Sequence, residues 1–142
     1  MIYMRILTEQ DIDIPRLASV YQLPEISKYL SISDNYFKYI ANTPNVYFYK
    51  AYKNNDMVGA IHLEIEKTVM FLSILVFPEF QRSGYGTEII RDVQNDVLNL
   101  NYETIEISVN EQNIASLNLF KKTGFTFASK EDELLNFVYK RG

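Results

Sequence analysis

The sequence predicts a mixed α/β fold with one largely antiparallel sheet of about seven strands. Three observations predict it. An apolar run at 69–76 leads through a glycine-containing turn into an amphipathic helix, which indicates a strand-to-helix crossover. Segments before and after this unit alternate apolar and polar residues, as half-buried strands do. Short turn signals join most of these segments, so strands that follow each other along the chain should pair as antiparallel neighbours.

The first part of the chain predicts one strand and two helical segments. Residues 2–7 alternate apolar side chains and indicate a strand. Thr8 can cap a helix that is interrupted or restarted near Pro15. After a stretch that is broken by Pro24, a second helix is expected at 34–42.

Three strands then form an antiparallel meander. Residues 46–53 are rich in aromatic and β-branched side chains, and an Asn-Asn-Asp turn separates them from a strand at 57–66. Gly59, inside that strand, predicts a bulge or a close approach of another backbone. The third strand, 69–76, contains only one polar residue, Ser73, and is therefore expected to be covered on both faces.

The last part of the chain predicts a helix, a strand, a second helix and a hairpin. The helices are expected at 87–98 and from Asn113 to Gly124, where Asn113 is the N-cap and Gly124 the C-terminal glycine. Residues 103–109 alternate strictly and form the strand between them, and 125–139 form the hairpin. Because a helix joins the strands at 69–76 and 103–109, these two strands should run parallel.

Length and composition favour one domain that spans residues 1–142. Hydrophobic residues make up 47% of the chain, enough for a substantial core. The net charge of −4 and the pI near 5.0 argue against a nucleic-acid partner. The absence of cysteine removes disulfides and a cysteine nucleophile, and no metal site is expected. Without a signal peptide or a membrane-spanning run, a cytoplasmic protein with no membrane contact is expected.

The turn at 81–87, Gln-Arg-Ser-Gly-Tyr-Gly-Thr, has the properties of an anion-binding site. The first turn of a helix offers unpaired backbone N–H groups and the positive end of the helix dipole. Gly84 and Gly86 remove the Cβ atoms that would keep a bulky anion away, and Arg82 adds a positive charge. A phosphate or pyrophosphate therefore fits there. No P-loop pattern is present, and the dinucleotide fingerprint fails because Ile89 stands in place of its third small residue.

This stretch, Leu-x-Val-x-Pro-Glu-Phe-Gln-Arg-x-Gly-x-Gly, resembles the acetyl-CoA signature of the GNAT N-acetyltransferase superfamily. Residues 113–125, Asn-Ile-Ala-Ser-Leu-Asn-Leu-Phe-Lys-Lys-Thr-Gly-Phe, resemble a second element of that family. The resemblance implies helices on both faces of the sheet, a central parallel strand pair that splays apart, and acetyl-CoA as cosubstrate in the gap. The residues that it implies for cofactor binding are Ile74, Leu75, Val76, Gln81, Arg82, Ser83, Gly84, Tyr85, Gly86, Thr87, Asn113 and Phe120.

The resemblance also implies acetyl transfer to an amine by direct attack in a ternary complex. Such a reaction must deprotonate the amine, stabilise an oxyanion and protonate the leaving thiolate. The backbone N–H of Leu75 or Val76 is the candidate for the oxyanion. The positions of the family's usual acid and base hold Phe120 and Ser108, so the catalytic residues stay unassigned.

Several other residues are open to two interpretations each. Glu64, His62 and Glu106 lie on the central strands and are possible bases, although each residue type is more often structural in such a place. Lys121 and Lys122 can meet the 3′-phosphate of the cofactor or form an ordinary solvated pair. The tyrosines of the helical segment can shape an acceptor pocket or only pack; they are Tyr29, Tyr36 and Tyr39.

The missing base favours an acceptor that is largely neutral near pH 7. An α-amino group has a pKa of about 7.7–8.0, whereas a lysine side chain has a pKa of about 10.4. We therefore expect a small-molecule amine such as a free amino acid. Two alternatives remain open: a peptide or protein N-terminal acetyltransferase, and a non-catalytic acyl-CoA-binding module. The sequence leaves both a monomer and a homodimer possible.

Overall fold

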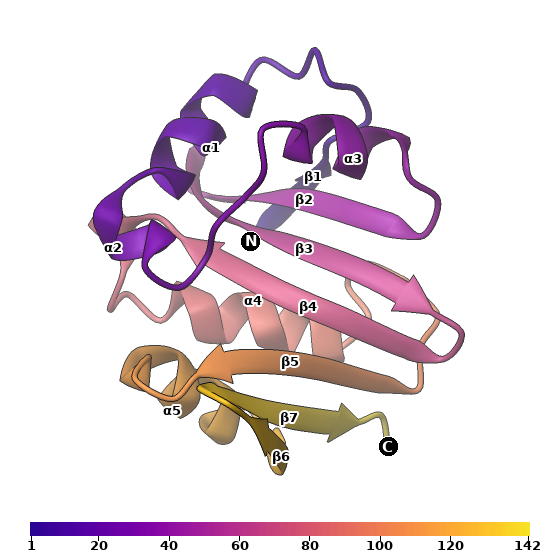
Figure 1. Ribbon diagram of the computed structural model, residues 1–142. Coiled ribbons are helices and arrows are strands. Elements are labelled where there is room, and N and C mark those ends of the chain that lie inside the picture. The colour runs from indigo at the N-terminus through magenta and orange to yellow at the C-terminus, as the bar shows by residue number, and fades with distance from the viewer.

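One seven-stranded sheet crosses the whole protein in the computed structural model, which describes residues 1–142 (Figure 1). The strand order is β1-β2-β3-β4-β5-β7-β6, and only β4 and β5 pair in parallel. The predicted mixed, largely antiparallel sheet with its central parallel pair is therefore confirmed. The strands are β1 (Ile2–Arg5), β2 (Val46–Lys53), β3 (Asp56–Glu66), β4 (Val69–Val76), β5 (Thr104–Asn110), β6 (Thr126–Glu131) and β7 (Leu134–Lys140).

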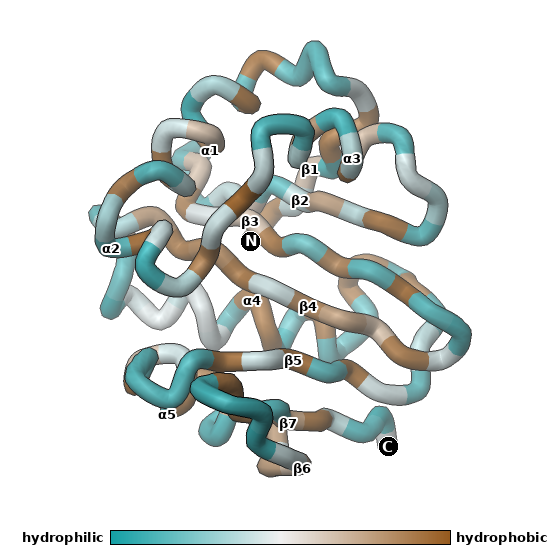
Figure 2. The backbone as a smooth tube through the Cα atoms, viewed as in Figure 1, coloured by the Kyte–Doolittle hydropathy of each residue, from teal (hydrophilic) through white to brown (hydrophobic).

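Helices cover both faces of this sheet, and each face has its own hydrophobic core (Figure 1). The helices are α1 (Ile14–Tyr21), α2 (Pro24–Ser27), α3 (Tyr36–Asn42), α4 (Tyr85–Gln94) and α5 (Ile114–Lys122), with a short 3₁₀ turn, η1 (Pro78–Phe80), after β4. The smaller core packs α1 to α3 on one face. The larger core packs α4 and α5 on the other face. Figure 2 shows apolar residues along β3 and β4, and mostly hydrophilic ones on β6.

The parallel pair is joined only at its beginning. Its paired residues run from Val69 with Thr104 to Phe71 with Glu106. Beyond Phe71, β4 continues to pair with β3, and β5 continues to pair with β7, but the two strands no longer pair with each other. The splayed pair is therefore present, and the edge of β4 that faces β5 is open over its second half.

Gly59 marks both a bulge and a close approach, as predicted. The register between β2 and β3 shifts beside it, between Ala51 and Tyr52. A Cβ atom at position 59 would lie 2.1 Å from the backbone oxygen of Leu75 on β4. Only glycine allows β3 to approach β4 this closely, directly beside the open edge.

Two expectations for the secondary structure and burial need correction. The helix expected from Thr8 begins only at Ile14, with a proline in its first turn, because residues 8–13 form turns. The expectation that β4 is covered on both faces is also wrong at Phe71, which is 42% exposed because α1 to α3 do not reach that end of the strand.

A buried ion pair holds the turns before α1 against the sheet. Lys50, on β2, is only 5% exposed, and its Nζ lies 2.9 Å from Asp11 Oδ2 and 2.8 Å from Asp13 Oδ2. Burial lowers the pKa of Lys50, but hydrogen bonds to Asp13 and Asp11 outweigh burial and raise it to about 12. The bond to Lys50 holds the pKa of Asp13 below its usual value of 3.8.

Replacing Lys50 with methionine is expected to lower the free energy of unfolding by about 2 kcal/mol, because two carboxylates lose their buried partner. The loss should be constant between about pH 4 and pH 10.5. It should shrink below pH 4, as Asp13 is protonated, and again as the pH rises from 10.5 through about 12, as Lys50 loses its charge. Urea unfolding across this range measures it. Lys53→Met, which breaks a more exposed pair with Glu88, should cost less than about 1 kcal/mol; equal losses in the two variants would contradict the burial argument.

Candidate active site

A cavity of about 470 Å³ opens where β4 and β5 part. It lies between the end of β4, the start of α4, one side of α5 and the segment around α2. Its lining is half hydrophobic. The residues are Glu25, Ile26, Tyr29, Leu30, Ile74, Leu75, Val76, Phe80, Gln81, Arg82, Gly84, Tyr85, Gly86, Thr87, Asn113, Ala115, Ser116, Asn118, Leu119 and Lys122.

The loop before α4 presents a row of unpaired backbone donors to this cavity. The N–H groups of residues 82–87 donate to no acceptor within the protein, and no side chain caps α4. Arg82 and Gly84 have left-handed φ angles of 65° and 80°, a backbone form that turns neighbouring N–H groups to one side. The Gln81 side chain donates to the carbonyl oxygen of Val76 at 3.2 Å and so ties the loop to β4. The arrangement suits a diphosphate.

A nearby carboxylate would oppose such an anion unless its charge were compensated. Glu88 lies in the first turn of α4, and its Oε1 lies 3.0 Å from Nζ of Lys53. The hydrogen bond to Lys53 lowers the pKa of Glu88, so the pair stays ionised and close to neutral overall. The positive end of α4 therefore keeps its effect on the cavity.

The open edge of β4 offers its own backbone groups. The N–H of Phe77 donates to the carbonyl of Val58 at 2.8 Å. Hydrogen-bonded pairs alternate along an antiparallel ladder, so the N–H of Leu75 faces β3, whereas those of Ile74 and Val76 face the gap. Of the two oxyanion candidates, Val76 therefore has the free donor and Leu75 does not.

One side of α5 forms the opposite wall of the cavity. Oδ1 of Asn113 accepts a hydrogen bond from the Ser116 N–H at 3.3 Å, so Asn113 caps the helix, as predicted, and also borders the cavity. Apart from Lys122, which was expected either to meet the 3′-phosphate or to stay solvated, the further lining residues on α5 were not predicted from the sequence. Their spacing of three or four residues along one helical face was the available signal; they are Ala115, Asn118, Leu119 and Lys122.

Ten of the twelve residues expected to contact the cofactor line this cavity, and two do not. Ser83 is exposed, as its neighbours in the loop are, but it is not among the lining residues. Phe120 is 3% exposed and packs edge-on against Phe125 in the larger core, with ring centroids 5.2 Å apart. Phe120 therefore does not line this cavity, because it packs into the larger core while other residues of α5 meet the cavity. The lining residues Glu25, Ile26 and Leu30 were missed because no spacing links them to the motif, and Phe80 was missed although it directly precedes Gln81 within the motif.

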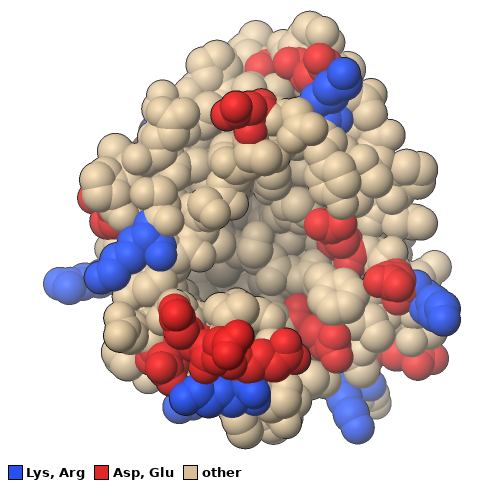
Figure 3. Space-filling view, viewed as in Figure 1, with Lys and Arg blue, Asp and Glu red and all other residues tan.

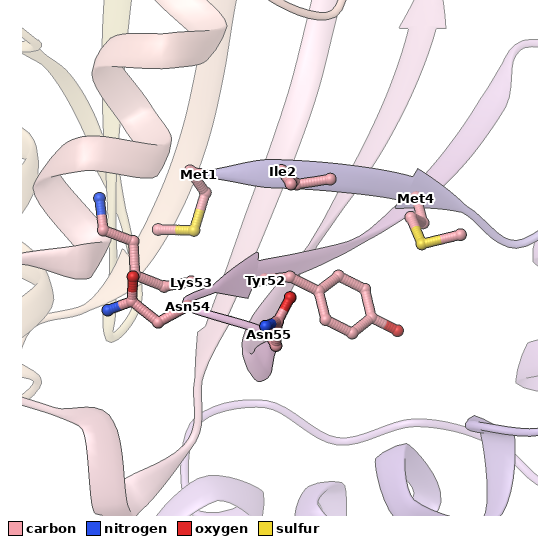
Figure 4. A pocket seen from close by; sticks show the side chains of 7 residues that line it. All are labelled: Met1, Ile2, Met4, Tyr52, Lys53, Asn54 and Asn55. Atoms are coloured by element: carbon pink, nitrogen blue, oxygen red, sulfur yellow. The ribbon is translucent and has the colours of Figure 1, made fainter.

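A second hollow lies at the opposite edge of the sheet, between β1 and the β2–β3 turn (Figure 4). Its lining includes Ile2 and Met4, which are 66% and 53% exposed. The figure shows the side chains of Lys53 and Tyr52 turned away from each other. Lys53 is already paired with Glu88, so this hollow has no convergent set of polar groups.

A chain of hydrogen bonds crosses the sheet face that carries α1 to α3. The Tyr36 hydroxyl lies 2.5 Å from His62 Nδ1, and His62 Nε2 lies 2.8 Å from Glu64 Oε2. The Tyr39 hydroxyl donates to Glu64 Oε1 at 2.5 Å. Figure 3 shows that this face is hollowed at its centre and that acidic side chains border the hollow.

Burial controls the ionisation of these hydrogen-bonded residues. It lowers the pKa of His62 below 6.5, although the charge and hydrogen bond of Glu64 act in the opposite direction. Burial also raises the pKa of Tyr36 far above 10, and the bond to Glu64 raises that of Tyr39. At neutral pH His62 is therefore an uncharged imidazole, held between a phenol and a carboxylate.

The other candidates for proton transfer lie apart from the hydrogen-bonded residues around His62. Ser108, at the position of the family's usual base, donates from its hydroxyl to Asn136 Oδ1 on β7 at 2.6 Å. Glu106 lies on β5 and pairs with Phe71 at the closed end of the parallel pair. Neither belongs to the network around His62.

The fold and the cavity define a class of protein. In this class a seven-stranded sheet contains a splayed parallel pair of strands, and the open strand of that pair leads to an uncapped helix. The sequence profile described as the acetyltransferase (GNAT) family matches residues 14–125. The chain belongs to this family, and the predicted resemblance is confirmed.

Known proteins resemble this chain in sequence or in fold. An uncharacterized N-acetyltransferase, YvbK of Bacillus subtilis, is 29% identical over 79 residues, which are 54% of this chain and 51% of that protein. The alignment thus spans about half the length of this curated relative. A Methanocaldococcus jannaschii domain shares the fold with a TM-score of 0.82 and 19% identity, covering 98% of this chain and 97% of that one. Spermidine N-acetyltransferase of Vibrio cholerae, in complex with CoA and spermine, has a TM-score of 0.78 and 16% identity, covering 98% and 95%.

None of the helices combines the length and the apolar composition needed to cross a bilayer. No group of three or more His, Asp or Glu side chains converges where a metal ion could be held.

Proposed function

We propose that this protein transfers the acetyl group of acetyl-CoA to the primary amine of a small molecule, by direct attack in a ternary complex. One observation carries the proposal: the open edge of β4 leads directly into six consecutive unpaired N–H groups at the start of α4. An extended chain ending in a diphosphate matches this arrangement, since amide groups can pair with the strand and phosphates with the helix start.

Within this proposal each part of the cavity has a task. Residues 82–87 hold the diphosphate, and the N–H of Val76 bonds an amide of the pantetheine arm. The N–H of Ile74, farther along β4 from the diphosphate, stabilises the oxyanion that forms when the amine attacks the thioester carbonyl. Asn113 and its neighbours on α5 confine the arm from the other side. Because Phe120 has no proton to give, the leaving thiolate takes its proton from solvent or from the attacking amine.

A small amine is favoured over a protein acceptor for two reasons. The hollow beside the cavity is bordered by acidic side chains, which attract an ammonium group (Figure 3). Spermidine is the named substrate of one protein of the same fold. Within this class we keep the preference for an α-amine, whose free base is more abundant at neutral pH than that of a lysine side chain.

Release of free thiol from acetyl-CoA over a panel of acceptors tests the function. The panel contains free amino acids, spermidine, lysyl peptides and peptides with free N-termini. Turnover is expected with small amines, and fastest with amino acids. Fastest turnover with peptide N-termini would favour the alternative of a peptide or protein N-terminal acetyltransferase. Acetyl-CoA binding without thiol release with any acceptor would favour the alternative of a non-catalytic acyl-CoA-binding module.

The cofactor's 3′-phosphate provides a separate prediction. Lys122 lines the cavity, whereas its neighbour Lys121 does not. Lys122→Gln should weaken acetyl-CoA binding about 5-fold, the effect of one exposed ion pair worth about 1 kcal/mol. The variant should bind 3′-dephospho-acetyl-CoA as the wild type does, by isothermal titration calorimetry. Lys121→Gln is the control, and equal effects of both substitutions on acetyl-CoA would show that only net charge matters.

A further inference from the structure

We propose that Tyr36, His62 and Glu64 form a proton relay that takes the proton from the acceptor's ammonium group and passes it to solvent. The proposal rests on the acetyl transfer proposed above and assigns the base that the family positions lack. Those positions hold Ser108, which is bonded to Asn136, and Phe120, which is buried.

The hydrogen bonds fix the direction of the relay. A carboxylate can only accept, so the 2.8 Å contact between Glu64 Oε2 and His62 Nε2 places the imidazole proton on Nε2. His62 Nδ1 then has a free lone pair, and the Tyr36 hydroxyl, 2.5 Å away, donates to it. Glu64, His62 and Tyr36 thus stand in the order carboxylate, imidazole, hydroxyl. This is the order found where a carboxylate orients an imidazole that activates a hydroxyl group.

The strand that carries His62 and Glu64 runs from the cofactor cavity to a hollow that is open to solvent. On β4 the residues paired with Ala60, His62 and Glu64 are Leu75, Ser73 and Phe71, in that order. Leu75 lines the cofactor cavity, whereas Phe71 and Glu64 line a separate open hollow of about 450 Å³ at the other end. The side chain of His62 is 12% exposed and that of Glu64 is 39% exposed, so a proton that reaches Glu64 meets water.

The groups around His62 allow its imidazole to gain and lose a proton in each turnover. Glu64 on β3, Tyr36 and Tyr39 on α3, and Tyr21 on α1 are the titratable groups that face the network. From β2 the facing residue is Phe48, and from β4 it is Ser73, so no cation opposes protonation. Burial keeps His62 neutral and ready to accept a proton at pH 7, and Glu64 then stabilises the imidazolium.

The proton balance closes without another reactant. The ammonium gives one proton to the Tyr36 oxygen while the Tyr36 hydroxyl proton passes to His62 Nδ1. The amine lone pair then forms the C–N bond at the thioester carbonyl, and the C–S bond breaks as the oxyanion collapses. The thiolate takes a second proton from nitrogen and leaves as a thiol. His62 releases its extra proton past Glu64 to solvent, so the products are amide, thiol and one proton.

Acceptors of different basicity test the relay. His62→Gln, Tyr36→Phe and Glu64→Gln are assayed with an ordinary alkylamine and with methoxyamine, whose nitrogen is already a free base at neutral pH. For the alkylamine, kcat/KM should fall about 100-fold in His62→Gln and Tyr36→Phe, which is the usual contribution of a general base. With methoxyamine it should fall less than about 5-fold, because no proton has to be removed. Acetyl-CoA affinity should be unchanged.

Two matched variants control for structural damage. Tyr3→Phe removes another partly buried hydroxyl that bonds a carboxylate, that of Asp92, at 2.6 Å. Glu66→Gln removes an exposed carboxylate from the same strand as Glu64. Both should keep the wild-type rate with either acceptor. Equal losses for both acceptors in His62→Gln, or no loss for either, would overturn the relay while leaving acetyl transfer intact. Absence of transfer by the wild type to any amine would instead reject the function and the relay together.

His62 is the only histidine in the chain, so its imidazole signal in an NMR titration is assigned without ambiguity. Its pKa in the wild type should lie below 6.5, and Glu64→Gln should lower it further by removing the stabilising carboxylate. The acidic limb of the kcat/KM profile for the alkylamine should move to lower pH in step with it. A limb that stays in place while the NMR pKa moves would show that His62 does not handle the proton.

Discussion

Replacing Gly86 with isoleucine is expected to weaken acetyl-CoA binding about 1000-fold, a loss of about 4 kcal/mol. A Cβ atom at position 86 would lie 3.4 Å from Cδ2 of Leu119 on α5 and 3.7 Å from Cγ2 of Val76 on β4. The first added carbon therefore just fits, and each further carbon fills the space between β4 and α5 that the pantetheine arm needs. Isothermal titration calorimetry measures the loss.

Gly86→Ala is the matched control for this variant. Its single methyl group meets only flexible side-chain atoms, and alanine favours the helix over glycine by about 1 kcal/mol. It should bind acetyl-CoA within about 5-fold of the wild type. Gly84 provides a different comparison: a Cβ there would meet nothing within 4 Å, but its φ of 80° strains any other residue. A folded Gly86→Ile protein that bound acetyl-CoA normally would contradict the proposed site.

Replacing Gly59 with alanine is expected to reduce the free energy of unfolding by at least about 3 kcal/mol. The added Cβ would lie 2.1 Å from the carbonyl oxygen of Leu75, and a backbone atom in the middle of a sheet cannot move aside as a side chain can. Separating β3 from β4 would also displace Val76, which pairs with Gly59. The variant should therefore lose both stability and acetyl transfer. Urea unfolding followed by circular dichroism measures the first.

The same chemical change at Gly86 serves as the control for Gly59. Both positions exchange a hydrogen for a methyl group, but only position 59 has a backbone atom in the way. Gly86→Ala should retain at least the wild-type midpoint in urea. If the two alanine variants unfolded at the same urea concentration, the close contact between β3 and β4 would not be the cause of the loss.

Local signals in the sequence were sufficient for most of the fold. The bounds of β2 and β4 were predicted to the residue, because a run rich in aromatic residues ends at an Asn-Asn turn and an aliphatic run ends shortly before a proline. The start of α1 was misplaced, since Thr8 has the chemistry of a cap but the chain forms turns as far as Asp13. What holds these turns in place is Lys50, more than thirty residues away in sequence. Local patterns carry no information on such a partner.

The site was predictable only as far as a contiguous motif reached. Gln81 to Thr87 follow one another along the chain, so their shared place at the start of α4 follows from the local backbone. The network of Tyr36, His62 and Glu64 joins α3 to β3 through sheet register and helix packing, and neither was visible in advance. His62 and Glu64 were recognised singly as possible bases, but their connection required the three-dimensional structure.

The three residue pairs between β4 and β5 also have a mechanical consequence. Within the seven-stranded sheet, these three pairs are the direct strand contact between one group of strands, β1 to β4, and the other, β5 to β7. A bound pantetheine arm would add backbone hydrogen bonds in the gap where β4 and β5 do not pair. We therefore expect the two halves to unfold more cooperatively when the cosubstrate is bound.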